Sequence, residues 1–98
     1  MLFHITHKHD ETICPLHDKE RGEATFGSLM QSLEENVDKV LGVWTDPAGH
    51  RVFIVVEASE QSQITMGLWP IIPAGTAEIV PVTDLAKMLE ARAAALNS

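Results

Sequence analysis

The 98-residue chain carries 14 acidic and 7 basic residues, a balance that repels the phosphate backbones of nucleic acids rather than neutralising them. Its length allows one hydrophobic core, so we expect a single domain over residues 1–98. No apolar run approaches the roughly 20 residues that span a bilayer, and MLFHITHKHD at the start does not read as a secretion signal. We therefore expect a cytoplasmic protein that binds neither nucleic acid nor membranes.

The chain starts with an expected strand over residues 2–9, LFHITHKH, in which side chains alternate between two faces. One face carries Phe3, Ile5, His7 and His9, and the other carries Leu2, His4, Thr6 and Lys8. Residues 10–24 are rich in charge and contain a proline and a glycine, which predicts a connecting loop. A connection of this length is uncommon in a compact domain unless it has a function.

Apolar residues at helical spacing follow, which predicts an amphipathic helix with its apolar side, including Met30, in the core. These residues are Phe26, Leu29, Met30, Leu33 and Val37. Residues 40–45 and 51–58 are β-branched and aromatic, and the DPAGH segment between them suits a hairpin turn. We therefore expect two antiparallel strands after the helix.

The last third of the chain predicts a short helix, a strand and a longer helix. Ser59 can cap the short helix, which Pro70 ends and which should turn Ile64 and Leu68 inward. Residues 76–82 read as the last strand, and Thr83 can cap an alanine-rich helix. The apolar stripe of that helix comprises Leu85, Met88, Leu89 and Leu96.

This order of elements predicts an α+β fold, the ferredoxin-like βαββαβ arrangement with a four-stranded antiparallel sheet and an added C-terminal helix. The helices of such a fold cover only one face of the sheet. Residues 52–56, VFIVV, are nevertheless apolar on both faces, which indicates burial on both sides. A second copy of the sheet would cover Phe53 and Val55, so we expect a twofold homodimer.

The chain resembles the dimeric α+β barrel superfamily, in which two ferredoxin-like protomers pack sheet to sheet. The matching segments are MLFHITH, LMQSLEENV, LGVWT, RVFIVVEA and GTAEIVPV, within residues 1–9 and 26–82. The resemblance is to a branch of small proteins and implies the fold and the dimer. It implies no single reaction, because the superfamily includes small monooxygenases, isomerases, haem-handling enzymes and ligand binders.

Residues 4–18 contain four of the five histidines and the only cysteine, so no disulfide can form within the chain. His7 and His9 lie on one side of the expected strand, with Cα atoms about 7 Å apart. Together with Cys14 and His17 they would supply three imidazoles and one thiolate to a zinc, iron or copper ion. The alternative is a hydrated loop, which the surrounding charged residues favour.

A second candidate site lies on the opposite face of the first strand. There His4 and Thr6 could meet Trp44, Phe53 and Glu57 in a pocket between the two sheets of a dimer. In such a pocket His4 and Glu57 could exchange a proton. The alternative is that the aromatic residues form the dimer core and Glu57 reaches water.

Three functions remain open from the sequence. The first is a homodimer that binds a small molecule or a metal, with the His/Cys cluster as the leading site. The second is a small oxygenase or isomerase that uses the pocket around His4, Trp44 and Glu57. The third is a structural or regulatory dimer without a ligand.

Overall fold

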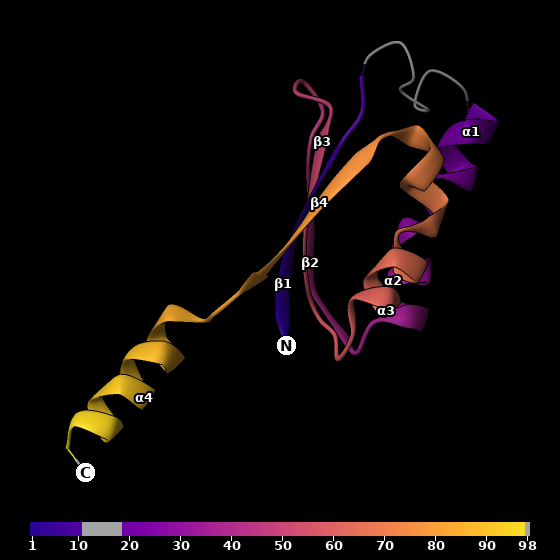
Figure 1. Ribbon diagram of the computed structural model, residues 1–98. Helices are drawn as coiled ribbons and strands as arrows, with labels where there is room; N and C mark the ends of the chain where they lie inside the picture. Colours follow the sequence, from indigo (N-terminus) through magenta and orange to yellow (C-terminus); the bar gives the residue numbers. More distant parts are fainter. Residues whose placement is uncertain (11–18, 98) are drawn as a thin grey trace.

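The computed structural model describes residues 1–10 and 19–97, which form one antiparallel sheet, helices on one of its faces and a projecting C-terminal helix (Figure 1). The elements are β1 (Leu2–Lys8), α1 (Lys19–Ala24), α2 (Phe26–Asn36), β2 (Lys39–Asp46), β3 (Arg51–Glu57), α3 (Gln61–Gly67), the 3₁₀ helix η2 (Trp69–Ala74), β4 (Thr76–Val82) and α4 (Leu85–Leu96). The predicted α+β class, consistent with a ferredoxin-like fold carrying an added C-terminal helix, is confirmed.

The four strands lie in the order β2-β3-β1-β4, and all neighbours are antiparallel. β1 occupies a central position, where Ile5 pairs with Ile54 of β3 on one side and Ile79 of β4 on the other. Because side chains alternate along a strand, this register places every second residue of β1 and β3 on the helix-covered face. The fully buried Ile5 and Ile54 are at the centre of that face.

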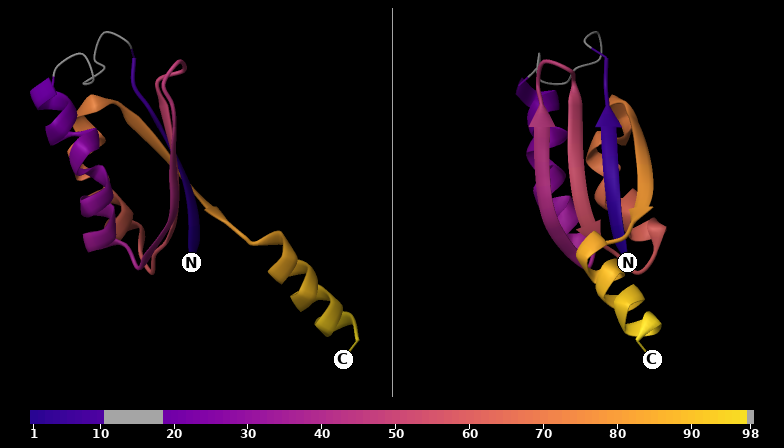
Figure 2. Two further views of the ribbon diagram at one scale, coloured as in Figure 1. Left: turned by 180° about the vertical axis from the view of Figure 1, so that it is seen from behind. Right: turned by 90° about the vertical axis from the view of Figure 1, so that its left-hand side faces the viewer.

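α2 and α3 lie side by side over this face (Figure 2). α2 contributes the buried Leu29 and Leu33, and the predicted inward position of Ile64 and Leu68 is confirmed. The expectation that Met30 belongs to the core is wrong, because its side chain is 45% exposed.

Three local predictions need correction. Residues 19–24, expected in a loop, form α1. Trp69–Ala74 form a 3₁₀ helix, although Pro70 was expected to end helical structure. Pro70 is tolerated because the first turn of a helix does not need its N–H as a donor. The expected caps are displaced by one residue. Glu60 caps α3 in a reciprocal capping box with Gln63, and the Asp84 carboxylate accepts a hydrogen bond from the Lys87 N–H in α4.

α4 projects away from the sheet on the side opposite α2 and α3 (Figure 2). All its residues are exposed, including the expected stripe, with Leu85 at 63% and Leu96 at 74%, and Met88 is likewise not a core residue. The projection extends the molecule to 58 Å and its radius of gyration to 16.0 Å. A compact chain of this size has a radius of about 13 Å.

The sheet face opposite α2 and α3 is called the open face below. Trp44 is 56% exposed there, while Phe53 and Val55 are half-buried. In residues 1–10 and 19–97, no helix is laid across the open face (Figure 2). Nor does any helix in these ranges combine the length and apolarity that crossing a membrane requires.

Candidate functional site

The end of β1 and the β2–β3 hairpin bring His9 and His50 together. The antiparallel register pairs Lys8 with Arg51, and one step further the His9 N–H donates to the His50 carbonyl at 3.0 Å. His50 closes the hairpin with a φ of 52°, a left-handed conformation uncommon for residues other than glycine. The Asp46 carboxylate holds this turn by accepting a hydrogen bond from the Gly49 N–H.

The imidazoles of His9 and His50 are in direct contact. Nε2 of His9 lies 3.3 Å from Nδ1 of His50, and the ring planes meet at 84°. His9 is only 6% exposed, whereas His50 is partly exposed. A neutral imidazole carries one proton on one ring nitrogen, so one member of the pair donates and the other accepts.

His7 is 1% exposed, and its ring lies next to that of His9. Its Nε2 donates to the Ile71 carbonyl at 3.0 Å, and the Phe26 ring packs against both His7 and His9. The Nδ1 atoms of His7 and His9 are buried and have no hydrogen-bond partner among the described residues. An unsatisfied buried polar group costs about 1–3 kcal/mol, so a group that bonded to either Nδ1 atom would recover that cost.

Burial keeps the two inner imidazoles neutral. It lowers the pKa of His7 below 6.5, although the hydrogen bond to Ile71 acts in the opposite direction. The pKa of His9 is also lowered, first by burial and then by the repulsion that charged His7 and His50 would exert. The neutral form is the one in which an imidazole binds a metal.

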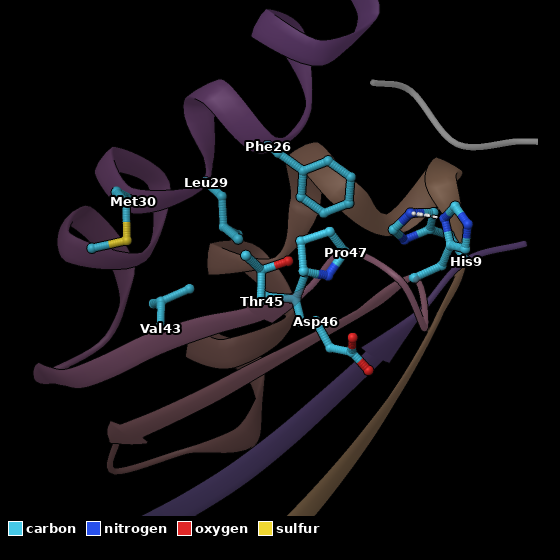
Figure 3. A pocket seen from close by; sticks show the side chains of 10 residues that line it. His9, Phe26, Leu29, Met30, Val43, Thr45, Asp46 and Pro47 are labelled. Carbon is cyan, nitrogen blue, oxygen red and sulfur yellow. Dashed lines mark hydrogen bonds between the residues drawn. The ribbon is translucent and has the colours of Figure 1, made fainter. Parts of the chain in front are cut away.

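A cavity of about 510 Å³ opens beside the histidine pair, between α2 and the β2–β3 hairpin (Figure 3). Its walls are mostly apolar, formed by Phe26, Leu29, Met30, Val43, Pro47 and Val52. The polar lining residues are His9, Thr45, Asp46 and His50. The volume lies within the range of about 300–1,000 Å³ found for small-molecule sites.

The Asp46 carboxylate is not directed into the cavity (Figure 3). It points away from the apolar walls (Figure 3) and forms an ion pair with Arg51 at 2.8 Å. The hydrogen bonds from Arg51 and Gly49 lower the pKa of Asp46, so the carboxylate stays ionised and bonded to these two residues. The imidazoles of His9 and His50 are therefore the titratable groups that the lining residues offer to a ligand.

The structure brings together part of the predicted metal cluster. The rings of His7 and His9 have centroids 5.8 Å apart, whereas Cys14 and His17 lie outside the described residues. In the part of the chain that is described, no three His, Cys, Asp or Glu side chains are grouped to hold a metal ion. Sequence reasoning missed His50, whose one signal was its place in the DPAGH turn before an apolar strand.

The second predicted site lies on the open face. Cross-strand pairing places Thr6 and Trp44 on either side of Phe53, and the His4 ring centroid is 6.4 Å from that of Phe53. Glu57 pairs with Leu2, which puts it on the same face, one diagonal step of about 7–8 Å from His4.

Among the described residues, neither the cavity beside His9 nor the second hollow of the surface gathers these five side chains. A depression of about 600 Å³ at the β4–α4 junction includes Glu57, but its lining does not include His4, Thr6, Trp44 or Phe53. The open face thus brings these side chains onto one surface, and within the described residues that surface has no second wall.

Comparison with known proteins assigns the chain to a family. None of the curated proteins compared with it matches. The family model described as "Domain of unknown function (DUF3303)" matches residues 1–96, from β1 to the last turn of α4. Because this match spans nearly all of the 98 residues, the chain belongs to the DUF3303 family.

Proposed function

We propose that this protein is a homodimer that binds one transition metal ion per protomer at the His9–His50 pair. The observation that carries the proposal is the 3.3 Å separation of His9 Nε2 and His50 Nδ1. Two nitrogens that each lie about 2.0–2.1 Å from a tetrahedral zinc are about 3.3–3.4 Å apart. A metal can take the place of the proton between these nitrogens if both rings turn to point their lone pairs at it, while the separation of the nitrogens stays the same.

The other ligands come from the cluster predicted from sequence. Cys14 and His17 follow His9 by five and eight positions, close enough in the chain to supply a thiolate and an imidazole. His7 keeps an unpartnered Nδ1, and its Nε2 bond to the Ile71 carbonyl is the type of contact that orients metal-binding imidazoles. Thiolate and imidazole ligands favour zinc, iron or copper over magnesium or calcium.

Metal uptake by variants tests the proposal. Protein purified without chelator or affinity tag is dialysed against Zn²⁺, and zinc is measured by elemental analysis. Wild type should hold one ion per protomer, and His9→Gln with His50→Asn should hold much less. Asparagine suits position 50 because it tolerates the left-handed φ of 52°.

Two further variants complete this test. The double variant Cys14→Ser, His17→Ala should also lose stoichiometric zinc. His4→Gln is the matched control, because His4 lies on the open face and should retain full uptake. Substoichiometric zinc in wild type, or equal zinc in the His9, His50 variant, would show that the two imidazoles form a hydrogen bond and do not bind a metal. The protein would then fit the structural or regulatory alternative.

The open face supports the homodimer. Phe53 and Val55 lie at its centre, and Trp44 of β2 pairs with Phe53. Val80 of β4, 40% exposed, lies on the far side of His4 from Val55. Exposed apolar side chains gathered on one face in this way mark an interaction site. A second copy related by a twofold axis presents the same surface and covers it.

The enzyme alternative also depends on this dimer. Oxygenase or isomerase chemistry would use His4 and Glu57, which share the open face with Trp44. A second sheet packed on that face would provide the missing wall and exclude water from the two groups.

A further inference from the structure

We infer that α4 is an arm that packs on the other subunit of the dimer, so that its apolar stripe is buried against the second copy of the chain. The stripe comprises Leu85, Met88, Leu89 and Leu96. The inference rests on the homodimer of the proposed function and adds the element that, besides the open face, contacts the partner.

α4 is an amphipathic helix that its own chain leaves uncovered. Leu85 is 63%, Leu89 51% and Leu96 74% exposed, and none of the residues of the helix is buried. A helix of 12 residues is marginally stable in water by itself, because most helical stability in proteins comes from the packing of an amphipathic face. A surface that covers the stripe would therefore stabilise the helix as well as bury its apolar side chains.

The direction of α4 carries it toward a second copy. The helix leaves the sheet on the side of the open face (Figure 2), and only Thr83 and Asp84 separate it from the last residue of β4. Two sheets that pack face to face lie about 10 Å apart. A helix of 12 residues is about 18 Å long, so α4 is long enough to reach the plane of a second sheet packed on the open face.

α4 and the open face share one hollow. The depression of about 600 Å³ at the β4–α4 junction includes Lys87 of α4 in its lining. The same lining includes Leu2, Glu57 and Val82, which lie on the open face according to the strand register. The helix and the open face are thus continuous around this hollow, and one partner can contact both.

The open face alone is small for a stable dimer. Four strands of seven or eight residues, about 4.8 Å apart, cover a flat area of roughly 400 Å². Stable interfaces bury about 800 Å² of each partner. A twofold axis that places α4 of each subunit against the other adds contact area to both copies.

The test compares two double variants of α4 that add the same charge. Leu89→Glu with Leu96→Glu places two carboxylates in the stripe, whereas Ala91→Glu with Ala94→Glu places them on the side of the helix turned away from it. All four positions are exposed in the single chain, and glutamate is a good helix former, so both variants should fold.

Sedimentation at a series of concentrations gives the dissociation constant of the dimer. The stripe variant should raise this constant about tenfold, because its carboxylates would be buried without partners. The control variant should change it by less than about twofold, since its carboxylates stay in water.

Hydrogen exchange in wild type identifies the surface that covers α4. The amides of residues 85–96 should be protected above the dissociation constant and should exchange rapidly once dilution gives the monomer. Equal protection of these amides in the monomer would show that α4 packs on the open face of its own chain, and would overturn the inference.

The outcomes separate this inference from the proposed homodimer. A wild-type dimer whose dissociation constant is the same in the stripe variant overturns the inference and leaves the homodimer standing. Equal weakening by the stripe variant and the control also overturns it, because the effect would then come from added charge and not from the stripe. A wild type that is monomeric at every concentration overturns both proposals.

Discussion

Nε2 of His9 lies 3.3 Å from Nδ1 of His50, although 41 positions separate the two residues in the chain. The contact follows from strand pairing, because the β1–β3 register ends at Lys8 and Arg51 and leaves the next residue of each segment face to face. The left-handed turn at His50 then aims its ring at His9. The sheet and its hairpin therefore bring the two residues together, and the Phe26 ring of α2 packs against His9.

Metal-free protein should lose stability as the pH falls below about 6.5, the reference value of an unfolded imidazole. His7 and His9 have pKa values lowered by burial, so below pH 6.5 the unfolded chain binds protons that the folded chain excludes. Stability then rises with pH across this window. Urea unfolding between pH 5.5 and 7.5, in the presence of chelator, measures the slope.

The variant His7→Gln provides the comparison for that slope. Glutamine can still donate to the Ile71 carbonyl but does not titrate, so the dependence on pH should become shallower. Asp38 and Asp46 have pKa values lowered from the ordinary 3.8 of an aspartate, so their titration does not contribute in this window. An unchanged slope in His7→Gln would show that His7 titrates normally in the folded protein.

Zinc affinity should fall as the pH drops below about 6.5, because binding displaces protons from imidazole and thiol ligands. Competition with a chelating dye at pH 5.5, 6.5 and 7.5 measures the apparent dissociation constant. The same affinity at all three values would indicate a carboxylate site in place of the histidines.

Gly75→Ala should destabilise the protein by roughly 1–3 kcal/mol, the usual cost of overpacking. A Cβ at this position would collide with the backbone carbonyl of Lys8 and approach Cε1 of His7 to 3.1 Å. Backbone atoms cannot move aside cheaply, so the end of β1 must shift. Thermal unfolding checks the loss, with Thr76→Ala as the exposed neighbouring control. A melting temperature equal to wild type would contradict the close approach of these two segments.

Phe53→Asp should convert the proposed dimer into a monomer or unfold it, because a carboxylate in an apolar contact has no partner to offset its lost hydration. Light scattering at micromolar concentration gives the mass. Met66→Asp is the control, since Met66 lies on α3, away from the open face, and should leave the dimer intact. A monomer mass for wild type would contradict the dimer, and a stable dimer of Phe53→Asp would show that Phe53 does not lie in the interface.

Periodicity in the sequence was enough to predict most of the fold. Leu29 and Leu33 recur at helical spacing and are buried in α2, and the alternation of Ile5 with its neighbours matches the two faces of β1. The core positions expected for Met30 and Met88 were wrong for a shared reason. An apolar stripe shows which side of a helix could be buried, but not whether anything lies there to cover it.

The candidate site was less predictable than the fold. His7 and His9 were identifiable because they cluster in sequence with the only cysteine. His50 was not, because its contact with His9 depends on which strand pairs with β1 and at which register. The cavity could not be foreseen either, since it exists where α2 and the hairpin diverge, and no local pattern records such a gap.

The most direct test of the metal site is anomalous diffraction at the zinc edge from crystals of the zinc-loaded protein. We predict one anomalous peak per protomer, about 2.0–2.1 Å from both Nε2 of His9 and Nδ1 of His50. A peak at any other place in the protomer, or no peak with the two imidazoles still 3.3 Å apart, would contradict the proposal.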